Sequence, residues 1–524
     1  MSIQIFLQGK LLGIDEFLFA PADQDHDQVF TGRSHWISLL SEILPRALLA
    51  ELGLAKILLG SSGGGQFLLV LPQESRDPAE AFLRAAAAEI AALSDGSLKL
   101  LWSVTENLGD WSDVRRRLTE AMDHRRGTPL DTGGAGDLVA CHSGESQPGG
   151  AGDLVAGQSS GGGDLVAGQP GAPDLVARHS ATSHDYFAGH LGMRLRDAES
   201  AAWSPETPGR ILIGEGKHVW SLAGSSVDPL PFARHAAPSD AGTEPASTAN
   251  LASRAAGLKT WGVLRGDVDN FGIRIRRAQT IEEHIQLSVM FKQFFAGELE
   301  VLCSMPEFWR KVTVIFSGGD DFAVYGAWDA LVGLARELER LFHRFAETNL
   351  KDFAGLEGKT ITMALALAPA RDASLGAVFE EAGQRLEAAK SSDKDCIWLL
   401  GRTLEWKQFA EAAELKDSLM RMIGEFHCSP QYLRDLCGIY RETQSKMSRR
   451  QARRTGGERP WRYHRRIRRI LSAARPVARR ERERNEFQKA RTSLIADLIG
   501  RSAVTVKLRP AGRVALEWAR LSAE

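Results

Sequence analysis

The 524-residue sequence lacks the features of a membrane-spanning or exported protein. It contains no run of about 18 apolar residues, which is roughly the length that a helix needs to cross a bilayer. Its first residues, MSIQIFLQGKLLG, contain no basic region, no long apolar stretch and no small-residue cleavage site, so we expect no export signal. We therefore expect a cytoplasmic protein that makes no contact with a membrane.

Cysteine is also scarce, and its spacing does not fit the usual zinc sites. The five cysteines are Cys141, Cys303, Cys396, Cys428 and Cys437. They include no CxxC pair and no Cys/His cluster with zinc spacing, so we expect no zinc. Reduced thiols are the simplest interpretation, in keeping with a cytoplasmic protein.

The small net charge of −1 hides an asymmetry along the chain. The stretch from Lys446 to Arg484 contains one Lys, fifteen Arg and three Glu, a net charge of +13, so the remainder of the chain carries −14. A basic stretch of this size is typical of proteins that bind polyanions. The alternative is a solvated helical face that pairs with the acidic remainder of the chain.

Hydrophobic periodicity predicts an α+β protein with two ferredoxin-like units. Residues 258–401 follow the order βα-ββ-αβ-αβ, which is typical of a ferredoxin-like palm. Residues 1–128 form a first α/β unit with similar elements, and residues 184–257 form a small connector. Residues 402–524 are expected to be an α-helical bundle that contains the Arg-rich stretch.

The second unit also contains a segment with an apolar helix face. The segment IEEHIQLSVMFKQFFAGELEVL has helical periodicity. Its apolar residues Ile281, Ile285 and Val289 are spaced to share one face.

Residues 129–183 have a different composition from the rest of the chain. The element GDLVA or PDLVA begins at Gly136, Gly152, Gly163 and Pro173, within a matrix of Gly, Ser, Gln and Pro. The spacing is irregular and too short for a solenoid repeat. Because this composition buries little apolar surface, we interpret the segment as a disordered low-complexity linker.

A glycine- and aspartate-rich hairpin carries the clearest chemical signal. In KVTVIF, SGGDD and FAVYGAW, Gly318 and Gly319 are expected to allow positive φ and to leave room for a nucleotide. Asp320 and Asp321 then stand at the tip, where adjacent carboxylates repel each other unless a cation lies between them. Asp267, at the end of the strand VLRGDV, supplies a third carboxylate beside the hairpin. For a GGDD turn taken alone, the alternative is an ordinary surface hairpin.

These carboxylates predict a site for two divalent cations, Mg²⁺ or Mn²⁺. The chemistry that follows is in-line attack of a 3′-hydroxyl on an α-phosphate, with the metals activating the hydroxyl and neutralising the triphosphate and its leaving pyrophosphate. Lys390 and Lys394 are candidates to hold the triphosphate tail, the alternative being solvated loop lysines. The backbone N–H groups expected to frame the β- and γ-phosphates are those of Asn270, Phe271 and Gly272.

At this point three segments show a resemblance to a known family. GVLRGDVDNFG, VIFSGGDDFAVYGA and AAKSSDKDCIWLLG resemble the second palm of the large subunit of type III CRISPR effector complexes, the CRISPR polymerase of Csm type. LQGKLLGIDEFLF, FTGRSHWISLLSEIL and LLGSSGGGQFLLVLP resemble the first palm of that family, and FARHAAPSD and LASRAAGLKTWGVL resemble its connector. WRYHRRIRRIL resembles part of its C-terminal helical domain.

This resemblance implies an antiviral nucleotidyltransferase. Members of the family use ATP to make cyclic oligoadenylates when the guide-bearing complex engages target RNA, and the product activates ancillary defence nucleases. The implied partners are ATP, the other subunits of the ribonucleoprotein, guide RNA and target RNA. Two palms of the GGDEF/cyclase type face each other, so that the second supplies the metals and the first holds the acceptor nucleotide.

The resemblance also implies a division of site residues between the palms. The expected catalytic and metal-binding residues are Asp267, Asp320 and Asp321. The expected nucleotide-binding residues of the second turn are Ser317, Gly318 and Gly319. The equivalent turn of the first palm is Ser62, Gly63, Gly64 and Gly65. No Asp follows that turn, and position 10 is Lys where the family tends to have Asp, so we expect this palm to bind ATP without catalysing. The expected nucleic-acid contacts are Arg462, Arg465, Arg466 and Arg469.

Two departures from the family concern nuclease and zinc chemistry. Many members carry an N-terminal HD nuclease domain, whereas this sequence begins at the first palm. The dipeptides His26–Asp27 and His184–Asp185 do not lie in a helical domain with further His or Asp ligands, and a metal site needs several convergent ligands. We therefore expect no HD nuclease domain and no cleavage of single-stranded DNA. The connector also lacks the cysteine zinc site that is frequent in the family.

Two other functions fit parts of the sequence. A diguanylate-type cyclase would share the chemistry, although the fourth turn residue is Asp321 rather than Glu and such an enzyme needs a homodimer. A non-enzymatic scaffold would use the Arg-rich bundle to hold guide or target RNA through phosphate contacts. The clustered aspartates favour an enzyme, because a scaffold has no use for them.

The composition of residues 129–183 leads to a first prediction. Shortening this segment should barely change stability, because loop closure costs only about 0.6 kcal/mol per doubling of loop length. Chemical denaturation of the shortened protein measures this change. A shortened chain that unfolds would show that the segment is structural.

Overall fold

The structure, a computed structural model, describes most of the chain outside the repeat segment. The described residues are 4–21, 26–127, 185–187, 195, 198–224, 226, 229–242, 244–450, 461–474, 481–499 and 510–524. The GDLVA repeats and the predicted linker 129–183 lie outside them. Across the described ranges, no helix is long and apolar enough to cross a membrane.

The first unit is a four-stranded antiparallel sheet covered by helices. Its strands and helices are β1 (Gln4–Leu12), α1 (Ile14–Leu18), α2 (His26–Glu51), η1 (Lys56–Leu58), β2 (Leu59–Gly63), β3 (Gln66–Pro72), η2 (Gln73–Ser75), α3 (Arg76–Leu93), β4 (Lys99–Glu106) and α4 (Trp111–Gly127). The strand order β2-β3-β1-β4 is that of a ferredoxin-like sheet. Helix α3 shows why the sequence folds in this way, since its buried residues Leu83, Ala86 and Ile90 recur every three to four positions.

The second unit repeats this topology and extends it. Its elements are β8 (Trp261–Val268), α8 (Phe271–Arg276), α9 (Ile281–Gln293), the π-helical turn η3 (Phe294–Glu298), α10 (Leu299–Ser304), β9 (Val312–Ser317), β10 (Asp321–Ala327), α11 (Trp328–Asn349), β11 (Ile361–Leu367), α12 (Leu375–Ser392), β12 (Cys396–Leu399) and β13 (Arg402–Glu405). The order is β13-β12-β11-β8-β10-β9, so its first four strands in sequence again form a ferredoxin-like sheet. Side-chain caps set two helix starts: Thr280 accepts from the N–H of Glu283, and Ser374 from that of Ala377.

The second unit differs from the sequence pattern at two places. The sheet does not end at residue 401, because β13 pairs with β12 in an antiparallel register. The buried face of α9 carries Leu287 and Phe291, whereas Val289 is 42% exposed. The helix lies against β2 of the first unit as well as its own unit, so a single apolar face does not describe its surroundings.

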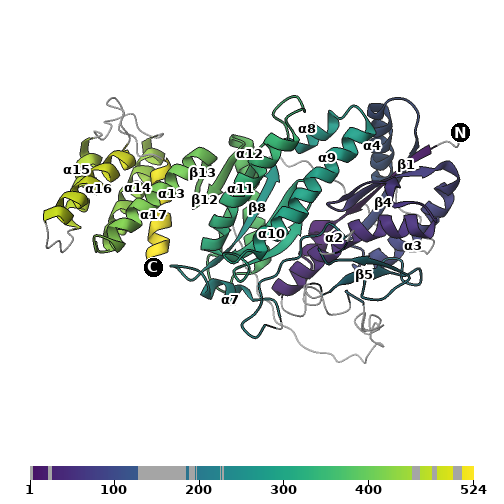
Figure 1. Ribbon diagram of the computed structural model, residues 1–524, viewed down its shortest axis with the longest axis horizontal. Helices are drawn as coiled ribbons and strands as arrows, with labels where there is room; N and C mark the ends of the chain where they lie inside the picture. Colours follow the sequence, from purple (N-terminus) through teal and green to yellow (C-terminus); the bar gives the residue numbers. More distant parts are fainter. Residues whose placement is uncertain are drawn as a thin grey trace, which may run out of the picture.

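The connector and the C-terminal helices complete the described chain. The connector contains β5 (Ser200–Trp203), β6 (Leu212–Ile213), β7 (His218–Ser221) and α7 (Thr248–Ser253), with a small sheet of order β6-β5-β7. The C-terminal helices are α13 (Trp406–Gly424), α14 (Gln431–Arg450), α15 (Trp461–Ala473), α16 (Glu481–Ile499) and α17 (Pro510–Ala523). Figure 1 shows an elongated molecule in which α15 and α16 lie at the opposite end from the first unit.

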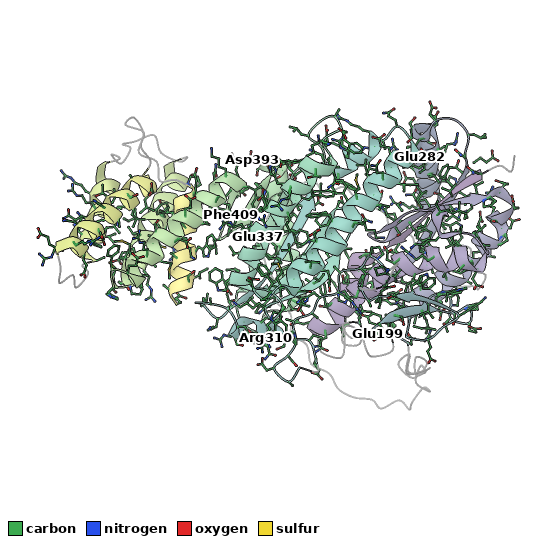
Figure 2. All side chains as sticks on the ribbon, viewed as in Figure 1. Glu199, Glu282, Arg310, Glu337, Asp393 and Phe409 are labelled. Carbon is green, nitrogen blue, oxygen red and sulfur yellow. The ribbon has the colours of Figure 1, made fainter. Side chains whose placement is uncertain are left out.

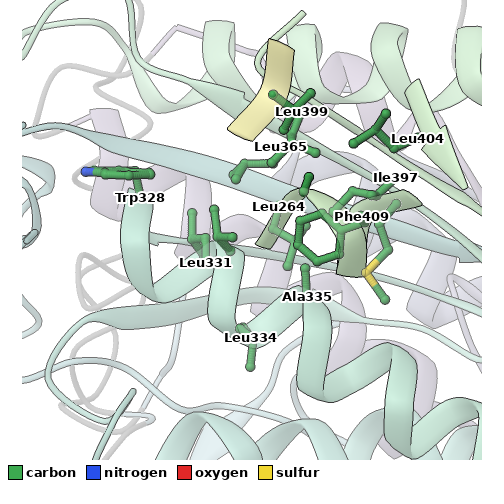
Figure 3. Close-up of a cluster of buried hydrophobic side chains, with 14 of the residues drawn as sticks. Leu264, Trp328, Leu331, Leu334, Ala335, Leu365, Ile397, Leu399, Leu404 and Phe409 are labelled. Carbon is green, nitrogen blue, oxygen red and sulfur yellow. The ribbon is translucent and has the colours of Figure 1, made fainter. Parts of the chain in front are cut away.

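One apolar core runs from the second sheet into the C-terminal helices. Figure 3 shows Leu264, Leu399 and Phe409 within the same buried cluster. Phe409 of α13 stacks on Trp518 of α17 with ring centroids 5.7 Å apart, and Figure 2 shows it at the junction with the helical end. This shared burial fixes the helices to the sheet. The α+β fold class is confirmed.

The aspartates of both HD dipeptides have structural contacts. Asp27 accepts hydrogen bonds from the N–H of Leu375 and the hydroxyl of Thr248, each at 3.0 Å. It therefore links α2 of the first unit to the start of α12 in the second. Asp185 accepts from the N–H of Phe187 and pairs with Arg210. His184 and the side chain of His26 lie outside the described residues.

Candidate functional site

The sheet of the second unit brings the three predicted aspartates to neighbouring positions. Asp321, the first residue of β10, is directly opposite Asp267 of β8 in the antiparallel register. Directly opposed residues project to the same face of a sheet, so both side chains lie on one side. Asp320 precedes β10, and its carbonyl accepts the N–H of Val268 at 2.9 Å. The hairpin tip is thus tied to the end of β8.

Burial and mutual repulsion perturb these carboxyl groups. Burial, together with the charges of Asp321 and Asp267, raises the pKa of Asp320 to about 8. Burial and the charge of Asp267 raise the pKa of Asp321 to about 6, against the attraction of Arg265. Burial also raises the pKa of Asp267, although Lys390 opposes that shift. A group of this kind gains from a cation that offsets the repulsion.

The glycines of this turn are required for a different reason from the one expected. Among the described residues with positive φ, neither Gly318 nor Gly319 is found. A Cβ at Gly318 would lie 2.1 Å from Oδ1 of Asp321, and the N–H of Gly318 donates to the carbonyl of Asp321 at 2.7 Å. Glycine at 318 is therefore needed for close approach, because it leaves space for the carboxylate of Asp321.

Asp267 has a cationic partner in this structure. Its Oδ1 lies 3.0 Å from Nζ of Lys390, which also lies 3.5 Å from Glu387. Within the described ranges, no group of three or more His, Cys, Asp or Glu side chains is spaced to hold a metal ion. The hard oxygen donors of the three aspartates have the right chemistry for Mg²⁺ or Mn²⁺. The three aspartates are neighbours, but their side chains do not converge on one point. The ammonium group of Lys390 occupies the position from which a metal ion would neutralise the charge of Asp267.

A cavity of about 480 Å³ opens beside this ion pair. Its lining includes these predicted residues: Asp267, Asn270, Phe271, Gly272, Asp320, Lys390 and Lys394. Asn270 has φ of 59°, a left-handed conformation that Asn tolerates, and it starts helix α8. Its side-chain oxygen accepts a hydrogen bond from Nζ of Lys394. Both predicted lysines therefore face the turn that follows Asp267.

A second cavity, of about 380 Å³, lies between the two units. It brings together residues of both glycine turns: Ser62, Gly63 and Gly64 from the first unit, and Gly319, Asp320 and Asp321 from the second. Trp111 and Phe271 also line it, and each presents an aromatic ring. In the first turn, Gly63, Gly64 and Gly65 all have positive φ, at 128°, 57° and 74°. This is the turn whose backbone needs glycine for its conformation.

The remaining predicted residues lie elsewhere. The linings of the two cavities do not include Ser317, Gly318 or Gly65. The four arginines belong to α15, which lies at the opposite end of the molecule from the first unit (Figure 1). Arg465 and Arg469 are exposed and Arg466 is half-buried, whereas the side chain of Arg462 lies outside the described residues.

Sequence reasoning missed Asp269, which is 1% exposed and supports the site from beneath. Its carboxylate accepts from the hydroxyls of Thr360 and Thr362, both at 2.7 Å, and from the N–H of Asp395 at 2.9 Å. It thereby joins the end of β8 to the loop that carries Lys394. Only the alternation of acids in DVDN hints at this role, since it puts Asp269 on the same face as Asp267.

Comparison with protein families agrees with these two halves of the site. A model of the Cas10/Cmr2 second palm domain matches residues 260–398, and a model of Csm1 subunit domain B matches residues 3–103. These domain matches support a large subunit of the Cas10/Csm1 type. The resemblance to the large subunit of type III CRISPR effector complexes is thereby confirmed. The matched regions contain both glycine turns and all three aspartates.

Curated relatives match only over segments. The chain is 28% identical over 174 residues to a protein of Enterococcus italicus named CRISPR system single-strand-specific deoxyribonuclease Cas10/Csm1 (subtype III-A). That match covers 32% of this chain and 22% of the relative. A protein of the same name from Mycobacterium tuberculosis is 33% identical over 122 residues, covering 20% of this chain and 15% of the relative. The matches thus span less than a quarter of either relative.

Solved structures show that the similarity of fold extends over the whole chain. The crystal structure of a Csm1–Csm4 cassette in complex with cA3 has a TM-score of 0.66 at 14% sequence identity. A cassette in complex with one ATP has a TM-score of 0.65 at 15% identity. Each comparison covers 100% of this chain and 70% of the other. At this level of identity the likeness concerns the fold.

The contacts of Asp269 lead to a prediction about stability. Asp269→Asn should lower the free energy of unfolding by about 1–3 kcal/mol, because an amide has one acceptor oxygen and leaves buried donors unsatisfied. Urea denaturation measures the loss, with Asp372→Asn, at an exposed turn position, as the matched control. Equal stability of the two variants would mean that these hydrogen bonds do not hold the strand end.

Proposed function

We propose that this protein polymerises ATP and cyclises the product into oligoadenylates. The observation that carries the proposal is the cavity between the units, whose lining includes Ser62 to Gly64 on one side and Gly319 to Asp321 on the other. One turn offers glycine backbone that a nucleotide can approach closely, and the other offers carboxylates. Two nucleotides held on the two sides of one cavity would bring a 3′-hydroxyl near an α-phosphate.

In this proposal Asp267, Asp320 and Asp321 hold the divalent cations, Mg²⁺ or Mn²⁺. Bound cations would lower the pKa of the attacking hydroxyl and neutralise charge on the triphosphate. Lys390 leaves its contact with Asp267 to bind the triphosphate, and Lys394 binds the same group from the loop that follows α12. Both lysines line the cavity beside Asp267, which supports this assignment.

The first unit holds the acceptor nucleotide against its glycine turn. Trp111 and Phe271 line the same cavity, and an aromatic face stacks well on a nucleobase. Because both turns belong to one chain, the reaction needs no homodimer. This feature favours an oligoadenylate synthase over a diguanylate-type cyclase, whose active halves come from two copies.

The ligands of the similar structures support this substrate class. Csm1–Csm4 cassettes have been solved in complex with one ATP, with pppApApA, with cA3 and with cA4. By analogy, we propose that this chain works beside a Csm4-like subunit in a type III-A ribonucleoprotein, with guide and target RNA as further partners. Synthesis by the assembled complex, measured from ATP with and without target RNA, tests this assignment.

A scaffold role can coexist with catalysis. Arg465 and Arg469 of α15 are exposed, and α15 lies at the opposite end of the molecule from the first unit. Exposed arginines on one helix suit contacts with an RNA backbone. In this role the C-terminal helices bind RNA while the two units react with ATP.

Neutralising the turn carboxylates should separate activity from stability. Asp320→Asn combined with Asp321→Asn should reduce oligoadenylate formation at least about a hundredfold, because metal stabilisation of the transition state is lost. Without divalent cations, the variant should unfold at an equal or higher temperature. The reason is that an acid whose pKa is raised by folding destabilises the ionised folded state above its ordinary pKa, and Asn carries no charge.

Thermal unfolding with and without Mn²⁺, beside product analysis, measures both effects. Mn²⁺ should raise the unfolding temperature of the wild type and leave that of the double variant unchanged. The control is Asp352→Asn with Asp372→Asn, two exposed acids of the same unit. Wild-type product yield from the turn variant would rule out these aspartates as the metal ligands.

The acceptor side can be tested at Gly64. This residue has φ of 57°, and beyond its chain neighbours no heavy atom lies within 4 Å of the point that a Cβ would occupy. Gly64→Asn should therefore fold while its side chain enters the cavity. We expect product formation to fall at least about tenfold, because the glycine surface that the nucleotide approaches becomes obstructed. Gly96→Asn, at another open position with φ of 78°, is the matched control. Undiminished synthesis would place the acceptor elsewhere.

A further inference from the structure

A buried ion-pair cluster joins the two units directly behind the first glycine turn. Lys292 comes from α9 of the second unit, whereas Glu42 and Arg46 come from α2 of the first. Their side chains are only 12%, 3% and 8% exposed, respectively. Oε2 of Glu42 lies 2.7 Å from Nη1 of Arg46, and its Oε1 pairs with Nζ of Lys292.

Lys292 uses its full hydrogen-bonding capacity in this cluster. An ammonium group has three N–H donors. Besides Glu42, its Nζ donates to the carbonyl oxygen of Ser62 at 2.7 Å and to the hydroxyl of Ser62 at 2.8 Å. Ser62 immediately precedes the three glycines with positive φ. A side chain of the second unit thus holds the backbone of the first unit's turn.

Helix α2 holds the same turn from the other side. The hydroxyl of Ser62 donates to Oε2 of Glu42 at 3.2 Å, and the N–H of Gly65 donates to Oγ of Ser41 at 3.1 Å. Both ends of the turn are therefore attached to consecutive residues of one helix. Because glycine backbone has no steric restraint of its own, these contacts decide where the turn lies.

The cluster also lies against the cavity that both turns share. Ser62, Gly63 and Gly64 line that cavity, and so does Ser288, one helical turn before Lys292 on α9. A Cβ at Gly63 would be 3.9 Å from Nζ of Lys292. A displacement of Lys292 would therefore move the wall on which the first nucleotide is proposed to rest.

The charged form of Glu42 is favoured despite its burial, whereas burial, opposed by Glu42, lowers the pKa of Lys292. Burial opposes the charged form of Glu42, but Lys292 and Arg46 outweigh it and lower the pKa of that carboxyl. Buried ion pairs often add little net stability compared with apolar side chains of similar size, and their directional contacts are better suited to fixing a geometry. The cluster therefore has the properties of a positioning device.

We propose that Lys292, held by Glu42, is a positioning residue that sets the first glycine turn at its working distance from Asp320 and Asp321. This inference rests on the proposed function, since it assigns the acceptor nucleotide to the first turn. Lys292 acts through the backbone of Ser62 and touches no reacting atom. It couples the acceptor side of the cavity, which belongs to the first unit, to the carboxylate side, which belongs to the second.

The test compares Lys292→Met, which keeps the aliphatic stem and removes all three donors, with Lys292→Arg, which restores a cation beside Glu42. The matched control is Lys311→Met, which removes a half-buried lysine paired with Asp329 at 2.9 Å within the second unit. Hydrogen–deuterium exchange of the full-length protein reports on residues 59–66. Binding of a non-hydrolysable ATP analogue is measured in the otherwise unchanged chain and in the Asp320→Asn, Asp321→Asn background, which retains the acceptor side.

We expect Lys292→Met to speed exchange in the turn about tenfold and to weaken analogue binding in the aspartate-free background about tenfold, because charge-assisted hydrogen bonds to the turn are lost. Metal-dependent binding in the otherwise unchanged chain should stay the same. Lys292→Arg should recover part of both losses, and Lys311→Met should show neither. Ser62→Ala removes the hydroxyl of Ser62 but keeps its carbonyl, so it should speed exchange in the turn by a smaller factor. This variant replaces Lys292→Met in the test if Lys292→Met does not fold.

Two outcomes would overturn the inference. In one, turn exchange and both binding measurements match the wild type in Lys292→Met. In the other, both binding measurements and the unfolding temperature fall together without recovery in Lys292→Arg, which would indicate a general structural role. Failure of the proposed function looks different: the wild-type complex would make no oligoadenylate from ATP, whatever the exchange of residues 59–66.

Discussion

The antiparallel pairing of β8 with β10 is the constraint on which the candidate site depends. It puts Asp267 directly opposite Asp321, an arrangement of like charges that costs free energy in a sheet. The sheet holds them there because β8 is a central strand, paired on its other side with β11, and buries Leu264 and Val268 in the core. The apolar interior of the unit thus maintains a concentration of negative charge at the ends of its central strands.

The cavity between the units depends on how firmly they are docked. Helix α2 of the first unit packs on β9 of the second, where Nε2 of the buried His35 lies 3.2 Å from the carbonyl oxygen of Val314. Burial lowers the pKa of His35 to about 4, so this contact involves a neutral imidazole at neutral pH. Asp27 adds a second junction to α12. These contacts hold the two units together. As a result, the two glycine turns face each other as opposite walls of one cavity.

Local sequence patterns identified the classes of element and the residues with unusual chemistry. Alternating and helical periodicity predicted an α+β chain with two similar units, because the burial of one face imposes those periods within a few residues. The SGGDD turn singled out Asp320 and Asp321, since adjacent carboxylates at a turn repel each other unless a cation lies between them. The expectation of positive φ at Gly318 failed, because the turn needs glycine there to make room for Asp321. The local pattern also did not give the buried face of α9, which buries Leu287 and Phe291 and lies against both units.

Only the tertiary structure could decide which distant residues meet. The ion pair of Asp267 with Lys390, the three donors that surround Asp269, and the contact between Glu42 and Lys292, 250 residues apart, all join elements separated by long stretches of chain. Hydrophobic periodicity within a segment does not predict these long-range contacts. The partner of a buried polar group depends on how the sheets and helices pack together. The sequence by itself determined which acidic residues could form the site, where the glycine turns lie and which segments have helical or strand periodicity. Packing decided which lysine compensates each acid and how the two turns share a cavity.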